Sequence, residues 1–183
     1  IIATEGQHNY HAAKKKAAER IGVSERLALP SNVEVKEALH RYLDLYGGSS
    51  HRQNLEQMRR AAIHIMRLLG DFNPRLVGSV LDGTAGRHSR IAFHVFADSI
   101  ESVVLFFSER DIDFSQEQRQ IRWHTGGHRF IPLIVSEFEG HAVELAVFEP
   151  VSLRQAPPSP IDGKPQSRAT LPEVEFLVSS PMS

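Results

Sequence analysis

The chain has 183 residues, of which 41% are apolar and 23% are charged, and its net charge at pH 7 is −1. This composition suits a single globular domain, with or without an appended segment. The absence of cysteine excludes a disulfide framework and thiolate metal sites. No apolar run approaches the roughly 20 residues of a membrane span, and the first residues do not resemble a signal peptide. The sequence therefore predicts a cytoplasmic protein with no membrane partner.

Charge is distributed unevenly along the chain. Residues 1–72 carry 11 Lys and Arg against 8 Asp and Glu, a balance of +3, whereas residues 73–183 carry 10 against 14, a balance of −4. A basic front half, including the run Lys14 to Lys16, either contacts phosphate groups or forms a solvated helical surface. The solvated surface is the favoured interpretation.

The front region, residues 1–72, is predicted to be helical, with helices over 9–21, 32–46 and 50–69. Ser31 and Glu34 have the spacing of a capping box at the start of the second helix. Gly70 is the expected cap at the end of the third helix. Periodic apolar residues predict the buried stripe of the second helix, namely Val35, Leu39, Tyr42, Leu43 and Tyr46.

The middle region, residues 73–150, predicts a mixture of strands and one helix. Strands are expected over 75–81, 91–97, 117–124, 128–138 and 141–149, and a helix runs from Asp98 or Ser99 to about Arg110. Glycine-containing pairs at the reversals between the last three strands predict antiparallel hairpins. Residues 151–183 then form a Pro-rich linker and a short C-terminal helix. The predicted fold class is α+β, a mixed sheet flanked by helices, with an N-terminal helical region.

One stretch, from Gly78 to Asp98, carries a motif. It opens with a Gly78-Ser79 turn, continues through the small residues Gly83, Ala85 and Ser89, and leads into a strand. This order resembles the signature of the DNA polymerase beta-like nucleotidyltransferase superfamily, and the chain resembles uncharacterised bacterial nucleotidyltransferase-like proteins. The resemblance covers roughly residues 74–149 and implies the small mixed sheet of that fold.

The resemblance also implies a chemistry, in which two aspartates one residue apart on a strand hold Mg²⁺ for transfer of a nucleotidyl group from an NTP to a hydroxyl. In this chain Arg90 and Ala92 occupy those two positions, and Glu144 stands where the third acid is expected. If the protein is active, the resemblance assigns Ser79 to the phosphates and Glu144 to Mg²⁺. Because the paired acids are missing, whether the chain is an enzyme stays open, and a degenerate protein that binds nucleotide, phosphate or RNA is favoured.

Each candidate residue has a second interpretation. Arg90 either forms an ion pair with Glu144 or binds an anion directly. His94 shares a strand face with Arg90 and is either a general base or a buried, hydrogen-bonded histidine. The Gly78-Ser79 turn either contacts phosphate or simply joins strand to helix. The alternative to nucleotide binding is a non-catalytic structural or interaction protein on the same fold.

Overall fold

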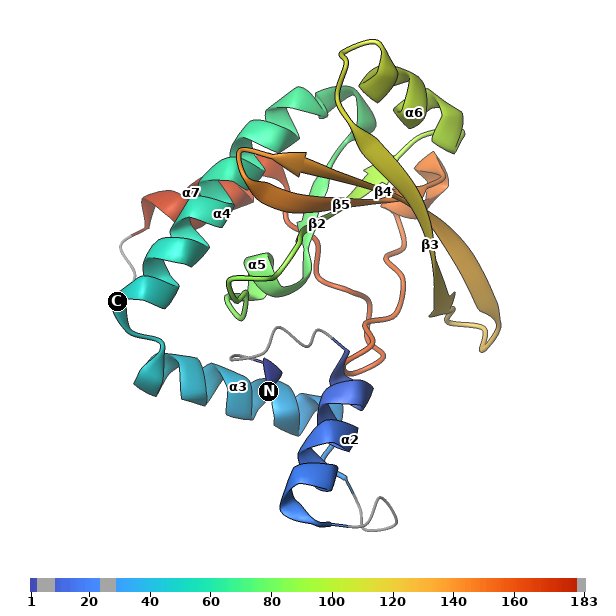
Figure 1. The fold of residues 1–183 in the computed structure, drawn as a ribbon. Helices are drawn as coiled ribbons and strands as arrows, with labels where there is room; N and C mark the ends of the chain where they lie inside the picture. Colours follow the sequence, from blue (N-terminus) through green and yellow to red (C-terminus); the bar gives the residue numbers. More distant parts are fainter. Residues whose placement is uncertain (3–8, 24–28, 181–183) are drawn as a thin grey trace.

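The structure is a computed structural model and describes residues 1–2, 9–23 and 29–180. Figure 1 shows a mixed sheet with helices packed around it and a helical N-terminal region below it, which confirms the predicted α+β class. The elements are α2 (Tyr10–Ile21), α3 (Asn32–Tyr46), α4 (Gly48–Leu68), η1 (Gly70–Phe72), β1 (Arg75–Val77), α5 (Gly78–Asp82), β2 (Ile91–Phe96), α6 (Ile100–Ser108), β3 (Phe114–Arg122), β4 (His128–Phe138), β5 (His141–Phe148), η2 (Pro150–Leu153) and α7 (Leu171–Ser179).

The five strands of the described chain are ordered β1-β2-β5-β4-β3. The β3–β4 and β4–β5 pairs are antiparallel hairpins, as predicted, and β1 also runs antiparallel to β2. The strands β2 and β5 instead run parallel, with Ala92 opposite Glu144. This parallel pair brings the two segments that carry the candidate site residues next to each other in the middle of the sheet.

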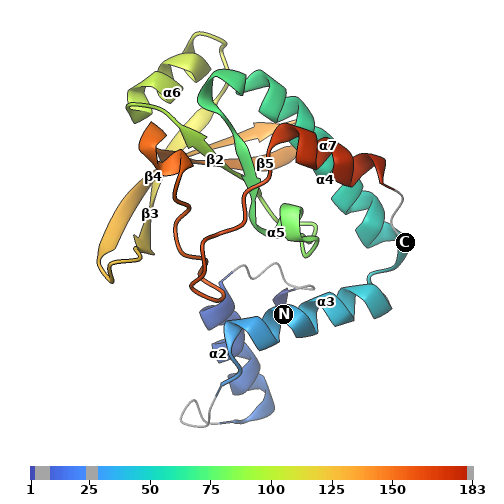
Figure 2. The same ribbon diagram turned by 180° about the vertical axis from the view of Figure 1, so that it is seen from behind.

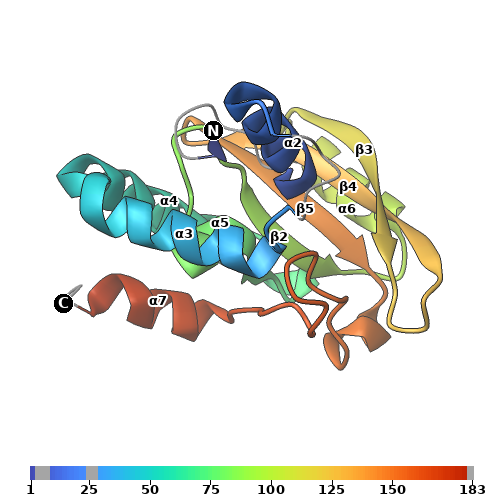
Figure 3. The same ribbon diagram turned by 90° about the horizontal axis from the view of Figure 1, so that it is seen from below.

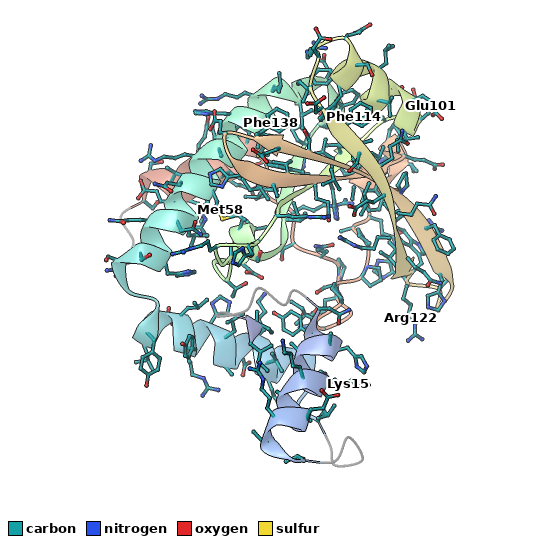
Figure 4. The ribbon with its side chains drawn as sticks, in the orientation of Figure 1. Lys15, Met58, Glu101, Phe114, Arg122 and Phe138 are labelled. Carbon is teal, nitrogen blue, oxygen red and sulfur yellow. The ribbon has the colours of Figure 1, made fainter. Side chains whose placement is uncertain are left out.

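The helices α4, α6 and α7 cover one face of the sheet. Their apolar side chains, among them Met58, Phe107 and Val174, form one core with inward residues of the strands such as Phe93 and Leu145. Figure 4 shows Met58 on α4. This core draws on all three regions that the sequence delimits, 1–72, 73–150 and 151–183. None of the described helices is long and apolar enough to cross a membrane.

The other face of the sheet carries the alternate residues of the same strands. A smaller apolar cluster, which includes Phe96, Trp123 and Phe148, lies on it. Figure 2 shows the segment between η2 and α7 looping from the sheet towards α2 and α3 before it returns to α7. The Asn32 side chain donates a hydrogen bond to the Pro160 carbonyl at the tip of this loop, at 2.8 Å.

The helices α2 and α3 begin where the sequence predicts. The Ser31 and Glu34 capping box is present in full, and the Ser31 main-chain N–H holds the pKa of Glu34 below its usual value. The predicted stripe of α3 is wrong at its end, because Tyr42 and Tyr46 are 43% and 73% exposed, whereas Leu39 is buried. Figure 1 shows α3 below the sheet, and Figure 3, seen from below, shows it in front of the sheet, so its apolar residues find little to cover.

Two sequence predictions fail near the start of the sheet. Gly70 does not cap α4; it begins a short 3-10 turn, and Asn73 adopts the left-handed conformation instead, with φ 48°. The predicted strand over 75–81 ends at Val77, because Gly78 has φ 72° and turns the chain into α5. The connection between β1 and β2 therefore contains a helical turn.

The C-terminal helix α7 forms as predicted. Thr170 and Glu173 make a reciprocal capping box at its start. The Thr170 hydroxyl, together with its main-chain N–H, keeps the pKa of Glu173 below its ordinary value. Helix α7 then packs along α4, and Arg67 forms an ion pair with Glu175 at 2.7 Å between them.

Candidate anion-binding site on the arginine face

The motif residues converge on the sheet face that the helices α4, α6 and α7 leave uncovered. Val77, Ala92 and Glu144 lie directly opposite one another across β1, β2 and β5. We call these three residues the central row. A Cβ placed on Gly78 would lie 3.9 Å from the Ala92 Cβ, so the turn that starts α5 lies beside the central row. The positions that carry the resemblance are thus neighbours in space.

An arginine–glutamate network occupies this row. The Arg90 guanidinium donates to the Glu144 carboxylate at 3.2 Å, and Arg119 donates to the same Oε2 atom at 2.7 Å. Arg90 also pairs with Glu117 at 3.2 Å, and the hydrogen bond from Arg90 to Glu117 raises the pKa of Arg90. The Glu144 side chain is only 6% exposed, so its charge is compensated almost entirely by the two guanidinium groups.

Glu117 and Arg119 were not singled out from the sequence. Both lie on β3, two strands away from Glu144, and only the β3–β4–β5 meander brings them to this row. Their alternation in the strand is the one sequence signal that they share a face.

This donor set does not fit Mg²⁺. Magnesium needs several hard oxygen ligands in octahedral geometry, and the Glu144 carboxylate is shared between two arginines whose fixed positive charge repels a cation. Asp82 accepts hydrogen bonds from Thr84 and pairs with Lys36 at 3.0 Å, so it is engaged elsewhere. Within residues 1–2, 9–23 and 29–180, no group of three or more His, Asp or Glu side chains is arranged to hold a metal ion.

His94 lies on the same face, two residues after Ala92, and is buried. Its Nδ1 atom accepts a hydrogen bond from Arg168 Nε at 2.9 Å, and its ring packs 4.6 Å from the ring of Phe148. Burial, with the nearby charges of Arg168 and Arg119, lowers the pKa of His94 to about 3. The imidazole is therefore neutral at pH 7 with its proton on Nε2, and this arrangement favours a positioning role for His94 over that of a general base.

Arg168 is the functional candidate that the sequence did not indicate. It lies in the Pro-rich segment, yet its side chain reaches His94 on β2. Its Nη1 atom donates to the Ser152 carbonyl at 2.7 Å, whereas its Nη2 atom is buried and has no hydrogen-bond partner among the described residues. The guanidinium also lies 5.0 Å from the centre of the Phe96 ring. Burial and the neighbouring charge of Arg75 lower the pKa of Arg168 to about 10, so it stays protonated at neutral pH.

Positive charge is in excess here, and we call this surface the arginine face. It carries Arg75, Arg90, Arg119 and Arg168, against the two carboxylates Glu117 and Glu144. Arg75 donates to the main-chain carbonyls of Asn73 and Pro74. In the part of the chain that the structure describes, no carboxylate lies within ion-pair distance of Arg168. The arrangement is chemically suited to an anion.

The Gly78-Ser79 turn has a structural role that is visible in its hydrogen bonds. The Ser79 carbonyl accepts from the N–H groups of Gly83, Thr84 and Ala85, which closes α5 after little more than one turn. Arg59 on α4 donates to the Val80 and Leu81 carbonyls at 3.1 Å each, satisfying two further carbonyls in the last turn of this short helix.

Comparison with known proteins gives no family: no family model, no curated protein and no solved structure matches the chain. The resemblance to nucleotidyltransferases remains a prediction from the motif.

Proposed function

We propose that the protein is a nucleotidyltransferase-like protein without metal-dependent transfer activity, and that it binds the phosphate groups of a nucleotide on the arginine face. One observation carries the proposal: among the described residues, the buried Nη2 atom of Arg168 has no hydrogen-bond partner and the guanidinium has no acid beside it. A buried polar group without a partner is unfavourable, and a phosphate oxygen would supply both the missing acceptor and the compensating charge.

The neighbours of Arg168 support this assignment. His94 accepts from Nε and Ser152 accepts from Nη1, so two of the three guanidinium nitrogens are fixed and Nη2 is the one left without an acceptor. A preorganised guanidinium loses less side-chain entropy when it binds a phosphate. The same face carries Arg75, whose charge adds to the attraction for an anion.

The geometry favours the non-catalytic form of the proposal. In an active family member, carboxylates hold Mg²⁺ ions, and these cations neutralise the leaving pyrophosphate, whereas here Arg90 and Arg119 both donate to the buried carboxylate of Glu144. An internal ion network in place of acids and metal neutralises the buried Glu144 without a cofactor, and it leaves the charges of Arg75 and Arg168 unpaired on the same face. Nucleotide binding without turnover is the function that this arrangement supports best.

Calorimetric titration with ATP in EDTA tests the proposal. The wild-type chain is expected to bind ATP without metal, and Arg168→Gln to weaken binding about ten-fold, the worth of one charge-assisted hydrogen bond. Arg41→Gln is the matched control, because Arg41 is exposed on α3, away from the arginine face, and makes no ion pair that the structure describes. Absence of ATP binding, or equal binding by Arg168→Gln, would refute the assignment.

A second candidate function, that of an interaction protein, is favoured by α3. Its side chains Tyr42, Leu45 and Tyr46 are 43%, 75% and 73% exposed, an unusual concentration of apolar surface on one helix end. Sedimentation of the wild-type chain and of Leu45→Ser tests this candidate. Concentration-dependent association that Leu45→Ser abolishes would support it, and a monomer at all concentrations would count against self-association.

A further inference from the structure

The β3–β4 hairpin extends beyond the rest of the sheet. The strands β3 and β4 form nine cross-strand pairs. In four of these pairs the β4 residue also pairs with β5 on its other side. In the other five, from Gln118–Pro132 to Arg122–His128, the β4 residue has no partner on β5. We call residues 118–132 the outer hairpin. Figure 4 shows Arg122 near its far end, away from the helices. Since β3 is also an edge strand, the outer hairpin is the most projecting part of the sheet.

The two sides of the outer hairpin differ in chemistry. On one side, Ile121, Trp123 and Ile131 pack into the smaller apolar cluster with Phe148, and this contact holds the hairpin in place. The other side, which we call the outer face, is formed by alternate residues of the two strands. Five of them are exposed, namely Gln118, Gln120, Arg122, His128 and Phe130, and the sixth, Pro132, is half-buried. Phe130 is 66% exposed and lies directly opposite Gln120.

The outer hairpin is also a local concentration of positive charge. From Gln118 to Pro132 the chain has three arginines, Arg119, Arg122 and Arg129, and no Asp or Glu. This balance of +3 lies within the region 73–183, whose overall balance is −4. Arg119 is engaged by Glu144, and Arg129 lies 4.1 Å above the Trp123 ring, which leaves Arg122 as the cation of the outer face.

We propose that the outer face binds single-stranded nucleic acid. An exposed aromatic ring offers a platform on which an unpaired base stacks, and a neighbouring arginine contacts the phosphate backbone. The amide groups of Gln118 and Gln120 flank Phe130 and Arg122 on the same face and can hydrogen-bond to base edges. Stacking on Phe130 requires unpaired bases, which is why the partner is a single strand.

The chemistry of the outer face favours a nucleic acid over a protein partner. Within residues 118–132, all of which the structure describes, Phe130 is the one large apolar side chain that is exposed, and amide, imidazole and guanidinium groups surround it. Protein interfaces instead centre on a contiguous apolar patch. This surface uses none of the residues of the Arg168 site, so the inference does not depend on nucleotide binding at that site.

Fluorescence anisotropy with a labelled oligouridylate of about 12 nucleotides tests the inference on the full chain. Oligothymidylate of the same length and a duplex of the same length are titrated in parallel. Binding of the single strands is expected at about 50 mM salt, with Phe130→Ser weakening it about ten-fold. Arg122→Gln is expected to lower the salt dependence, the slope of log K against log salt, by about 0.7, the contribution of one single-strand phosphate contact.

Phe176→Ser on α7 is the matched control, because Phe176 is 71% exposed and lies outside the hairpin, and it is expected to bind like the wild-type chain. Circular dichroism establishes that each variant is folded. The inference is overturned if no oligonucleotide binds, if Phe130→Ser binds as tightly as wild type, or if the duplex binds as tightly as the single strands. Loss of binding in Arg168→Gln but not in Phe130→Ser would also overturn it, since the strand would then be held by the Arg168 site.

Discussion

In the network around Glu144, removing the two arginines is expected to destabilise the fold more than removing the glutamate. The Glu144 side chain is 6% exposed, whereas those of Arg90 and Arg119 are 40% and 53% exposed. In the double variant Arg90→Gln/Arg119→Gln, a buried carboxylate is left without a cation, and that change costs about 3–5 kcal/mol of unfolding free energy. In Glu144→Gln, the two partly exposed guanidinium groups keep contact with water, and one of them can still donate to the carbonyl of the introduced amide, so the cost is about 1 kcal/mol.

Urea unfolding at pH 7, followed by circular dichroism, measures both free energies. Arg41→Gln serves as the control for loss of an exposed guanidinium and is expected to lie within about 0.5 kcal/mol of wild type. The reasoning is refuted if Glu144→Gln is as destabilising as the double variant, or if the double variant is as stable as wild type.

Three further predictions concern single elements of the structure. His94 has a pKa of about 3 in the fold and about 6.5 when unfolded, so between these values the unfolded chain binds more protons and stability falls as pH falls. Between pH 7 and 5 the titration of His94 lowers the unfolding free energy of the wild-type chain by about 2 kcal/mol. The drop in unfolding free energy over the same interval should be about 2 kcal/mol smaller in His94→Asn. Equal drops in the two proteins would argue against the burial of a neutral imidazole. Arg59→Met leaves the Val80 and Leu81 carbonyls without their donor and should lower the unfolding free energy measured in urea by about 3 kcal/mol. The control Arg60→Met, at an exposed site, should lower it by less than about 1 kcal/mol. Equal losses would mean that Arg59 does not hold α5. Arg90→Asp/Ala92→Asp should create Mg²⁺ affinity measurable by calorimetry, because two carboxylates then point to the same face beside Glu144; no affinity would mean that the row is not spaced for a metal.

The local elements could be predicted from the sequence where side chains close to each other in the chain define them. The capping box of Ser31 and Glu34 and the hairpin at Glu139-Gly140 depend only on neighbouring residues, and both form. The α5 helix was predicted only in part. A strand-to-helix turn at Gly78-Ser79 was among the interpretations, but the strand expected over 75–81 runs into residues that form α5, which is held by Arg59, about 20 residues earlier.

The candidate site was only half visible in the sequence. The Arg90–Glu144 pair was among the predicted alternatives, since the motif aligned both residues with acid positions. Arg168 was not, because its partner His94 is 74 residues away and the Pro-rich segment gives no periodic signal. A long connection that returns to the sheet through tertiary contacts carries no local pattern from which its place could be predicted.

The dependence of ATP binding on metal tests the central claim most directly. Wild-type protein is titrated with ATP in EDTA and again in excess Mg²⁺, and pyrophosphate release is followed in the same samples with each of the four NTPs. The arginine face predicts binding in EDTA, no gain in affinity from Mg²⁺ and no pyrophosphate, because Glu144 is held by Arg90 and Arg119. Binding that requires Mg²⁺, together with pyrophosphate release that Glu144→Gln abolishes, would contradict it.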